Sequence, residues 1–313
     1  MSIPSPITYF GGKSRLAEQI VELFPPHRHY VEVCGGSLAV LLAKPPSAQE
    51  TVNDLNKSLM TFWRMVRDRP EDLERACSLT PHSRAERELA WSIADDLDEL
   101  EIARRVFVAL TQGRMGSQTK TGWRHDTGEK TTAMPVRLAR YAGRIAPAAA
   151  RLAAVSLECR PAVEMVEAYG RHRSNLLYID PPYDTPRAAS YAVDMSGDDH
   201  KQLIDAALAA TSAVVVSGYA GGQWDQRLSD AGWYRHEITT TTTQGGSGQP
   251  RTEVVWSNRI TTESTIDSVV IPAHRCPQCT AIVKQPARGR RRTFCSRSCR
   301  DAARYRRVMG ARS

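Results

Sequence analysis

The sequence contains no run of eighteen apolar residues, the length that a helix needs to cross a bilayer, which argues against a membrane-spanning protein. Its first residues, MSIPSPITYFGGK, lack the apolar segment of a secretory signal peptide. Apolar residues make up 41% and charged residues 24% of the chain, as is typical of soluble globular proteins. We therefore expect a cytoplasmic protein without a membrane partner.

Most of the chain also lacks an excess of positive charge, although its formal net charge is +8. Residues 273–313 hold twelve Lys and Arg and one acidic residue, so the preceding 272 residues are slightly acidic. Within them, residues 114–144 are a local exception, with seven basic residues against Asp126 and Glu129. These two basic regions would meet a phosphate-bearing partner, and each also suits an ordinary solvated surface.

Four of the seven cysteines form two close pairs near the end of the chain, in a CxxC and a CxxxC spacing separated by fifteen residues. Four thiolates at this spacing suit a tetrahedral structural Zn²⁺, and a segment of about 40 residues is too short for a core without such a staple. We expect zinc to be bound by Cys276, Cys279, Cys295 and Cys299.

Arginines surround this predicted zinc module, among them Arg290, Arg291 and Arg292. We favour binding to the DNA backbone as their role, because phosphate contacts need cations and no particular base sequence. A purely structural tail and a protein-docking module are the alternatives.

Short β-branched runs alternate with helical patterns in two parts of the chain. The expected strands begin or lie at residues 30–42, 51–55, 176–180, 214–217 and 253–256, with helices at 163–169 and 199–210. Such alternation predicts an α/β fold with a mostly parallel sheet and helices on both faces.

The alternation stops between residues 57 and 155, where the pattern is helical and clearest at 86–110. We interpret residues 57–155 as an inserted subdomain in a catalytic domain formed by 1–56 and 156–258. Residues 259–272 are a Thr- and Ser-containing linker, and 273–313 form the zinc-binding basic tail.

No GxGxxG motif occurs, so the usual support for a dinucleotide site is missing. Three other segments point to a ligand that carries a nucleoside. Residues 10–13 (FGGK) combine closely approachable backbone with a cation, residues 32–37 form a glycine-containing turn from strand to helix, and Asn53-Asp54 ends a strand where an acidic residue commonly accepts from ribose hydroxyls. Each could be a simple turn, and their combination favours the ligand.

Residues 178–183 (YIDPPY) carry the chemistry. Two consecutive prolines hold the chain extended and remove two N–H donors, so the carbonyls beside them and the Asp180 carboxylate form a cluster of acceptors. Tyr183 supplies a flat stacking face. An exocyclic amine on a planar base requires this combination, because acceptors bind its N–H groups and a ring holds the base.

Together these segments resemble the adenine-specific DNA methyltransferases of the Dam-like group (class α, also called the D12 class). The resemblance extends over residues 7–258 in the family's motif order. The matching segments are 10–13 (FGGK), 31–36 (the motif written FxGxG), 53–56 (NDxN), 180–183 (DPPY) and 251–258 (RTEVVWSN, similar to the closing TEVLWxN strand). In the second segment Val33-Cys34-Gly35 replaces the usual Phe-containing start, and the four-cysteine tail lies outside the family core.

The resemblance implies a Rossmann-like methyltransferase sheet, S-adenosylmethionine as methyl donor and double-stranded DNA as partner. It implies that Asp180 and the carbonyl of Pro181 accept from adenine N6 and that Tyr183 stacks on a base flipped out of the duplex. The catalytic residues are then Asp180, Pro181, Pro182 and Tyr183. The expected cofactor-binding residues are Tyr9, Phe10, Gly11, Gly12, Lys13, Glu32, Cys34, Gly35, Gly36, Asp54, Glu158, Cys159 and Asp180.

The inserted subdomain is where such enzymes read DNA, and its basic loop combines base-reading side chains, phosphate partners and one aromatic ring. Our candidates for DNA contact are Arg114, Lys120, Trp123 and Arg124, each of which also suits a surface loop. A bacterial or phage-infected bacterial cell is the expected setting, and a cognate restriction endonuclease is a candidate partner.

Several alternatives stay open at this stage. Methylation at cytosine C5 would need a cysteine nucleophile, commonly in a Pro-Cys pair, and none of the seven cysteines follows a proline. Acceptors such as those of Asp180 also suit cytosine N4 or adenine N6 in RNA. A catalytically silent, zinc-containing DNA-binding protein is the alternative of a different class.

Overall fold

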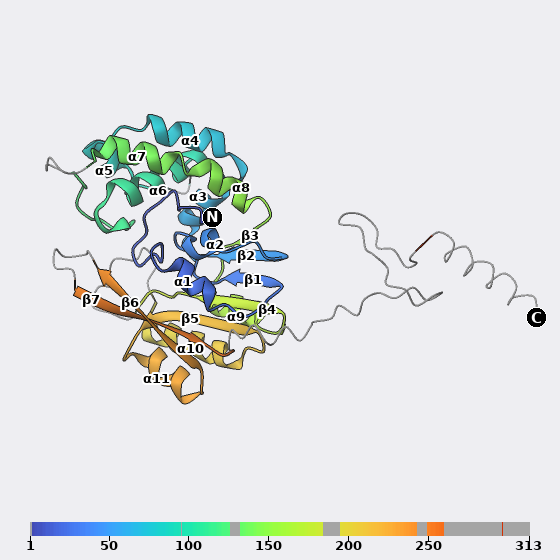
Figure 1. The fold of residues 1–313 in the computed structure, drawn as a ribbon. Helices are drawn as coiled ribbons and strands as arrows, with labels where there is room; N and C mark the ends of the chain where they lie inside the picture. Colours follow the sequence, from blue (N-terminus) through green and yellow to red (C-terminus); the bar gives the residue numbers. More distant parts are fainter. Residues whose placement is uncertain are drawn as a thin grey trace, which may run out of the picture. The chain divides into compact units, whose positions relative to one another are not determined.

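A computed structural model describes residues 2–94, 96–125, 132–183, 195–242, 249–259 and 296 (Figure 1). The chain divides into two compact units, residues 1–261 and 262–313, and the fold below is that of the first. The four cysteines of the predicted zinc module and Arg290, Arg291 and Arg292 lie outside the described residues. Among the residues that are described, no cluster of three or more His, Cys, Asp or Glu could hold a metal ion.

The described strands form one seven-stranded sheet in the order β3-β2-β1-β4-β5-β7-β6. β1 pairs in parallel with β2 and β4, β2 with β3, and β4 with β5, whereas β7 is antiparallel to both β5 and β6. This is a doubly wound order whose direction reverses between β1 and β4. The strands are β1 (His29–Glu32), β2 (Gln49–Asn53), β3 (Ser156–Glu158), β4 (Asn175–Ile179), β5 (Ala213–Tyr219), β6 (Tyr234–Thr242) and β7 (Gln249–Ser257).

Both faces of the sheet are covered, because successive residues of each strand point to opposite sides. On β4, Leu176 and Tyr178 belong to one apolar core, and Leu177 and Ile179 belong to the other. The first core is shared with α1 (Ala17–Glu22), α2 (Ala39–Ala43) and the helices between β2 and β3. The second is shared with α9 (Ala162–Tyr169), α10 (Gly197–Ala209) and α11 (Gln223–Asp230). The predicted α/β, Rossmann-like fold with helices on both faces is confirmed.

A group of helices lies between β2 and β3, at one edge of the sheet in Figure 1. The first of them, α3, begins where the Asn56 side chain accepts from the backbone N–H of Leu59, and it buries one apolar face. The group consists of α3 (Lys57–Asp68), α4 (Pro70–Leu79), α5 (Arg84–Leu89), α6 (Glu99–Gln112), the short 3₁₀ helix η1 (Arg114–Gly116), α7 (Met134–Ala142) and α8 (Ile145–Leu152).

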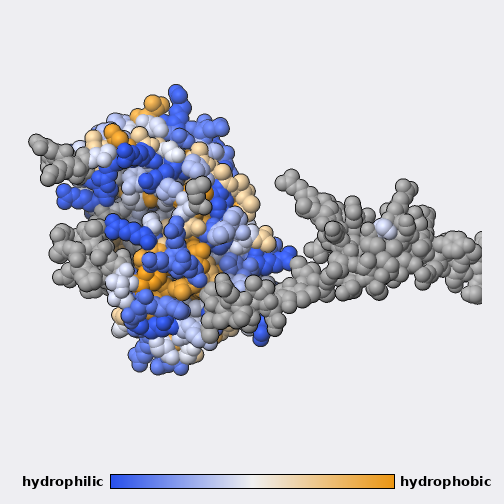
Figure 2. Space-filling model, viewed as in Figure 1, coloured by the Kyte–Doolittle hydropathy of each residue, from blue (hydrophilic) through white to orange (hydrophobic). Residues whose placement is uncertain are grey.

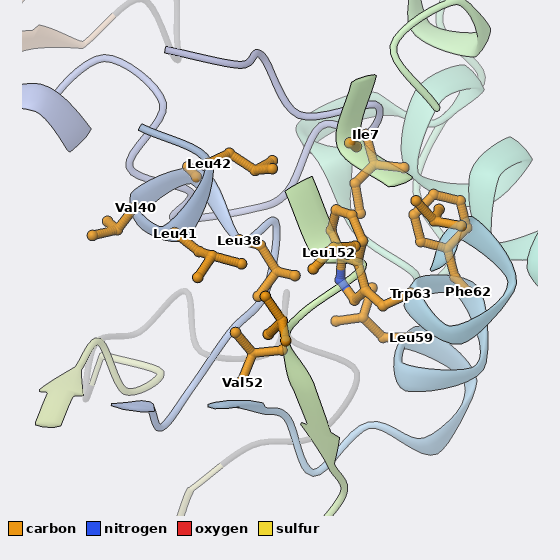
Figure 3. Packing of buried hydrophobic residues seen from close by; sticks show 14 of the residues in the cluster. Ile7, Leu38, Val40, Leu41, Leu42, Val52, Leu59, Phe62, Trp63 and Leu152 are labelled. Carbon is orange, nitrogen blue, oxygen red and sulfur yellow. The ribbon is translucent and has the colours of Figure 1, made fainter. Parts of the chain in front are cut away.

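These helices share the core of the sheet and do not enclose a separate one. Leu59 and Trp63 of α3 and Leu152 of α8 lie in one buried cluster with Leu38 and Val52 of the sheet layer (Figure 3). The insertion predicted at residues 57–155 therefore extends the catalytic unit as one packed body.

One sequence-based expectation about these helices is wrong. Residues 86–110 do not form a continuous helical stretch but are divided between α5 and α6. The side chain of Ser83 caps α5, and that of Asp98 accepts from the backbone N–H of Leu100 to begin α6. A second capping side chain starts a new helix, since it satisfies N–H groups that a continuous helix would use internally.

In the described part of the chain, none of the helices combines the length and the apolar character that a membrane span requires. Figure 2 shows hydrophilic side chains over much of the visible face, with an apolar area near its centre.

Candidate active site

One pocket opens where β1, β2 and β4 end, at the carboxyl edge of the parallel strands. Parallel sheets bind ligands there, next to the point at which the strand order reverses. The pocket joins segments that are far apart in the sequence: residues 9–13, the turn after β1, the end of β2 and the residues after β4. Its lining is Tyr9, Phe10, Gly11, Gly12, Lys13, Glu32, Val33, Cys34, Gly35, Gly36, Ser37, Ala39, Val40, Asn53, Asp54, Leu55, Asn56, Arg160, Ala162, Tyr178, Asp180, Pro182 and Met195.

The turn after β1 requires glycine at two positions. Gly36 has a φ of +51°, a conformation that residues with a side chain rarely adopt. The Gly35 N–H donates to the carbonyl of Asn53 at 2.7 Å, and a Cβ at Gly35 would lie 3.0 Å from that carbonyl oxygen. The backbone of this turn therefore lies directly against the end of β2, and both line the pocket.

Asn53 holds the ends of three strands together. Its side-chain amide donates to the carbonyls of Val33, at 2.9 Å, and Arg160, at 3.0 Å, and its oxygen accepts from the Arg160 N–H at 2.8 Å. Only the amide of Asn offers donors and an acceptor at this position. The first residue of the NDLN segment thus supports the pocket wall by fixing the loops after β1 and β3.

Asp54 presents its carboxylate to the same wall. One oxygen accepts from the Gly36 N–H at 2.9 Å, and the other accepts from the Asn56 N–H at 2.9 Å. Burial raises the pKa of the Asp54 carboxyl, against the opposing effect of these two hydrogen bonds. Each carboxylate oxygen has a second lone pair, so Asp54 suits a ligand that offers a pair of hydroxyl groups.

Glu32 lies buried at the base of the pocket. A single carboxylate oxygen accepts from the hydroxyl of Tyr30 at 2.8 Å and from the backbone N–H of Leu41 at 2.9 Å. Burial raises the pKa of Glu32 to about 8. This carboxyl therefore carries a proton over much of the neutral range.

Lys13 and Asp180 form an ion pair at the mouth of β4. The ammonium lies 2.7 Å from Asp180 Oδ1 and 3.0 Å from the carbonyl oxygen of Gly11, and the lysine side chain is 6% exposed. The resemblance implied that Lys13 contacts the cofactor. In this structure it lines the pocket and also neutralises the carboxylate of the DPPY segment.

Tyr183 adds its hydroxyl to the same cluster, 3.0 Å from Asp180 Oδ1 and hydrogen-bonded to Glu253 Oε1. Its ring meets Tyr219 edge to face at 4.4 Å, and the Lys13 ammonium lies 4.8 Å from the ring centre. The stacking face predicted for Tyr183 is thus turned into the protein in this conformation.

Glu253 is the residue of this cluster that sequence reasoning missed. It lies on β7, its side chain is buried, and Lys13 Nζ is 3.4 Å from its Oε1. Burial raises the pKa values of Glu253 and Asp180, and the charge of Lys13 opposes this effect at both. The signal in the sequence was a single acidic residue inside an otherwise apolar strand, RTEVVWSN, which we had interpreted only as a strand.

Two residues expected at the cofactor do not line the pocket. Glu158 accepts from the hydroxyl of Tyr169 at 3.4 Å, and Cys159 is exposed, with its thiol 3.8 Å from the carbonyl oxygen of Leu55. Arg160, the next residue, lines the pocket instead. The other eleven residues expected at the cofactor all contribute to the lining.

The candidates for DNA contact lie on one loop of the helical group. Arg114 and Lys120 are exposed. Trp123 is half-buried and stacks on His82, with ring centres 4.3 Å apart, and on His125, at 5.3 Å. The guanidinium of Arg84 lies 4.6 Å from the Trp123 ring. Trp123 is therefore part of an aromatic and cationic stack, while Arg114 and Lys120 face solvent.

This loop contacts the segments that build the pocket. Hydrogen bonds between Arg114 N–H and Gly122 O, at 2.9 Å, and between Arg124 N–H and Gln112 O, at 2.8 Å, hold it together as a narrow turn. The Phe10 N–H donates to the carbonyl of Gly116 at 2.9 Å, and the Asn56 side chain donates to that of Gln118. The loop is thus linked directly to both the FGGK and the NDLN segments.

The pocket suits a nucleoside that carries a cationic group. Asp54 at one wall offers acceptors for hydroxyl groups, backbone at Gly35 and Gly36 allows close approach, and Asp180 supplies a carboxylate at another wall. The donor set contains nothing that would require a metal.

Comparison with known proteins gives one family match. Residues 9–108 match the model of the D12 class N6 adenine-specific DNA methyltransferases. The matched residues include the FGGK and NDLN segments, whereas the DPPY segment lies beyond them. No curated protein matches the chain.

Several solved structures are distantly similar to this chain. A precorrin-6y C5,15-methyltransferase from Geobacter metallireducens is 10% identical, covers 78% of this chain and 86% of its own, and has a TM-score of 0.33. A methyltransferase from Geobacter sulfurreducens is 12% identical, with 80% of each chain covered and a TM-score of 0.30. An rRNA methylase from Streptococcus thermophilus is 7% identical, with 77% of this chain and 94% of its own covered and a TM-score of 0.31. The fold is assigned from the strand order, and the family match rests on residues 9–108.

Proposed function

We propose that the protein is a DNA methyltransferase that transfers a methyl group from S-adenosylmethionine to N6 of adenine in double-stranded DNA. The observation that carries this proposal is the position of Asp180, Pro181, Pro182 and Tyr183 at the end of β4, beside a pocket lined by the FGGK and NDLN segments. The family match over residues 9–108 supports the same reaction class.

In this proposal Asp54 and the backbone of Gly35 and Gly36 hold the nucleoside part of the methyl donor. When bound, S-adenosylmethionine supplies an activated methyl group on a positively charged sulfur. The Asp180 carboxylate and the carbonyl of Pro181 accept from the two N–H groups of the adenine amine and orient its nitrogen. No covalent intermediate is needed, so orientation and preorganised charge account for most of the rate.

Lys13 gives Asp180 its acceptor role. The ammonium at 2.7 Å favours the ionised carboxylate in a buried place where burial opposes ionisation. An ionised carboxylate accepts two hydrogen bonds without donating one, as the target amine requires.

Tyr183 has to leave its present partners before it can stack on a flipped base. Its hydroxyl occupies the Asp180 oxygen that we assign to the amine. Entry of the base would therefore displace the phenol from Asp180 and turn the ring toward the base, a motion of one side chain.

The loop that carries Arg114, Lys120, Trp123 and Arg124 is our candidate for DNA contact within the helical group. Exposed cations at Arg114 and Lys120 suit phosphate groups, and the loop's contacts with Phe10 and Asn56 would couple DNA binding to the pocket. We further propose that the tail binds Zn²⁺ through Cys276, Cys279, Cys295 and Cys299 and contacts the DNA backbone.

The test is a methyl-transfer assay with methyl-labelled S-adenosylmethionine and mixed-sequence duplex DNA or RNA, followed by digestion and identification of the labelled nucleoside. We expect label in N6-methyladenosine from DNA, loss of the label with Asp180→Ala, and normal labelling with Asp230→Ala, which changes an exposed aspartate at the end of α11.

Other outcomes would assign other functions. Label in N4-methylcytidine would change the target base, and label only in RNA would change the substrate. DNA binding without any label would favour a catalytically silent DNA-binding protein.

A further inference from the structure

The Tyr183 hydroxyl lies between two carboxyl groups. It is 3.0 Å from Asp180 Oδ1 and hydrogen-bonded to Glu253 Oε1, and both oxygens also lie near the Lys13 ammonium, at 2.7 Å and 3.4 Å respectively. Four polar side chains from three separate segments, the FGGK loop, the end of β4 and β7, thus meet in a buried cluster.

The hydrogen bonds of this cluster require an additional proton. A phenol has one O–H, so it can donate to only one of the two carboxyl oxygens. The other contact becomes a hydrogen bond when that carboxyl is protonated and donates to the phenol oxygen. With one such proton, the two carboxyls and Lys13 together are neutral, which suits a buried place.

Burial acts in the same direction. It raises the pKa values of both Asp180 and Glu253, and the negative charge of each raises that of the other site, as two neighbouring carboxyls that cannot both ionise easily would show.

We propose that Asp180 and Glu253 share one proton through the Tyr183 hydroxyl in the free protein, release it when the cationic methyl donor binds, and regain it from the target amine after transfer. This inference rests on the proposed function. It makes Glu253 the residue that stores the proton, at one remove from the reacting nitrogen, and Tyr183 the link between the two carboxyls.

The atoms and charges balance over one turnover. The nitrogen lone pair forms the new N–C bond, the S–C bond pair stays on sulfur, and the product amine then loses one proton. As the positive charge of the sulfonium disappears, the proton taken up by the carboxyl pair replaces it, so the charge of the site is unchanged. Binding of the next donor molecule returns that proton to solvent.

The other ionisable groups around the cluster were considered. Glu32 of β1, Tyr178 of β4 and Cys34 each interact electrostatically with Asp180, and Tyr219 of β5 contacts the Tyr183 ring. Burial raises the pKa values of Tyr178 and Cys34 well above their usual range, and Glu32 forms its own hydrogen bonds with Tyr30 and Leu41. Only Asp180, Glu253 and Lys13 are bridged by hydrogen bond or ion pair to one another within the described cluster.

Calorimetry tests the inference without turnover. S-adenosylmethionine and S-adenosylhomocysteine are titrated separately into the full-length protein at pH 7, in buffers with different ionisation enthalpies, and the number of protons released per ligand is obtained. The two ligands share every ionisable group and differ by the methyl group and the sulfonium charge. We expect about one more proton to be released with S-adenosylmethionine than with S-adenosylhomocysteine.

Glu253→Gln should abolish this difference, because the glutamine amide can donate to the Tyr183 oxygen and no stored proton is then needed. The matched control is Glu237→Gln, an exposed glutamate on the neighbouring strand β6, which should keep the wild-type difference.

Equal proton release with both ligands in the wild-type protein would overturn the inference while leaving the proposed function intact, as would an unchanged difference in Glu253→Gln. Failure of both ligands to bind would instead overturn the proposed function and the inference with it. The wild-type comparison is decisive by itself, so it does not depend on the folding of any variant.

Discussion

The ammonium of Lys13 lies 2.7 Å from the carboxylate of Asp180, although 167 residues separate them in the chain. The two belong to the FGGK and DPPY segments, and each had an independent reason to be singled out in the sequence. Their ion pair joins the cofactor pocket to the acceptor of the target amine.

Replacing Lys13 with Met should destabilise the protein, because Asp180 and Glu253 would lose the cation that lies between them. Removing one partner of a buried pair costs about 3 kcal/mol or more. The measurement is urea unfolding at pH 7, with Lys201→Met, an exposed lysine on α10, as the control. Equal stability of the two variants would mean that the ion pair contributes no net stabilisation.

Glu32 should make the protein less stable as the pH rises. The folded protein holds the Glu32 proton up to a pKa of about 8, whereas the unfolded chain releases it near the model value of 4.5. The folded state therefore binds more protons between these values, and its advantage, on the order of 4 kcal/mol, is present below pH 4.5 and is lost as the pH rises toward 8.

Glu32→Gln should reduce this pH dependence, because the glutamine oxygen can still accept from Tyr30 and Leu41 without a titrating proton. Urea unfolding at pH 5, 7 and 9 measures the effect, with the exposed Glu22→Gln as the control. If the wild-type protein and Glu32→Gln lost stability in parallel, Glu32 would not be the group responsible.

Gly35→Ala should disrupt the pocket wall. The added Cβ would lie 2.7 Å from a Leu38 methyl group and 3.0 Å from the Asn53 carbonyl oxygen, so the turn would have to shift at a cost of about 1–3 kcal/mol. We expect the affinity for S-adenosylhomocysteine to fall at least about tenfold, as each 1.4 kcal/mol of binding energy corresponds to that factor.

The control for this substitution is Gly197→Ala at the start of α10, where no atom lies within 4 Å of the added Cβ. Calorimetric titration of both variants gives the affinities. A Gly35→Ala protein that bound the ligand as tightly as Gly197→Ala would place the ligand away from this turn.

Arg114→Ala and Lys120→Ala should each weaken binding to duplex DNA and lower its dependence on salt. A lost phosphate contact reduces the slope of log K against log salt concentration by about 1. Fluorescence anisotropy over a series of salt concentrations measures both effects. Arg171→Ala, an exposed arginine after α9, is the control, and an equal loss in all three variants would contradict a specific role for this loop.

The purified full-length protein should contain about one zinc ion per chain, held by four thiolates. The double variant Cys276→Ser with Cys279→Ser should lose the metal, whereas Cys159→Ser, which changes an exposed single cysteine, should retain it. Elemental analysis by plasma emission measures the content. A metal-free wild-type protein prepared without chelators would contradict the zinc assignment.

The sequence by itself predicted the α/β architecture and most of the pocket. Parallel strands end at the same edge of a sheet, so segments such as FGGK, NDLN and DPPY that follow or precede strands were expected to converge. Asp54 and Asp180 could be identified in this way, because an acidic residue at a strand end has few structural reasons to be there.

Other features were decided only by the tertiary structure. Glu253 faces the cluster because β7 runs antiparallel beside β5, a register that no local pattern specifies. The division of residues 86–110 between α5 and α6 follows from capping by Ser83 and Asp98, and these side chains could also have been ordinary helix-surface residues. The stacking of Trp123 on His82 joins residues about forty positions apart, and the position of the Tyr183 ring against Tyr219 depends on β4 and β5 being neighbours. Local sequence determines which residue types follow a strand, whereas long-range pairing decides which of them meet.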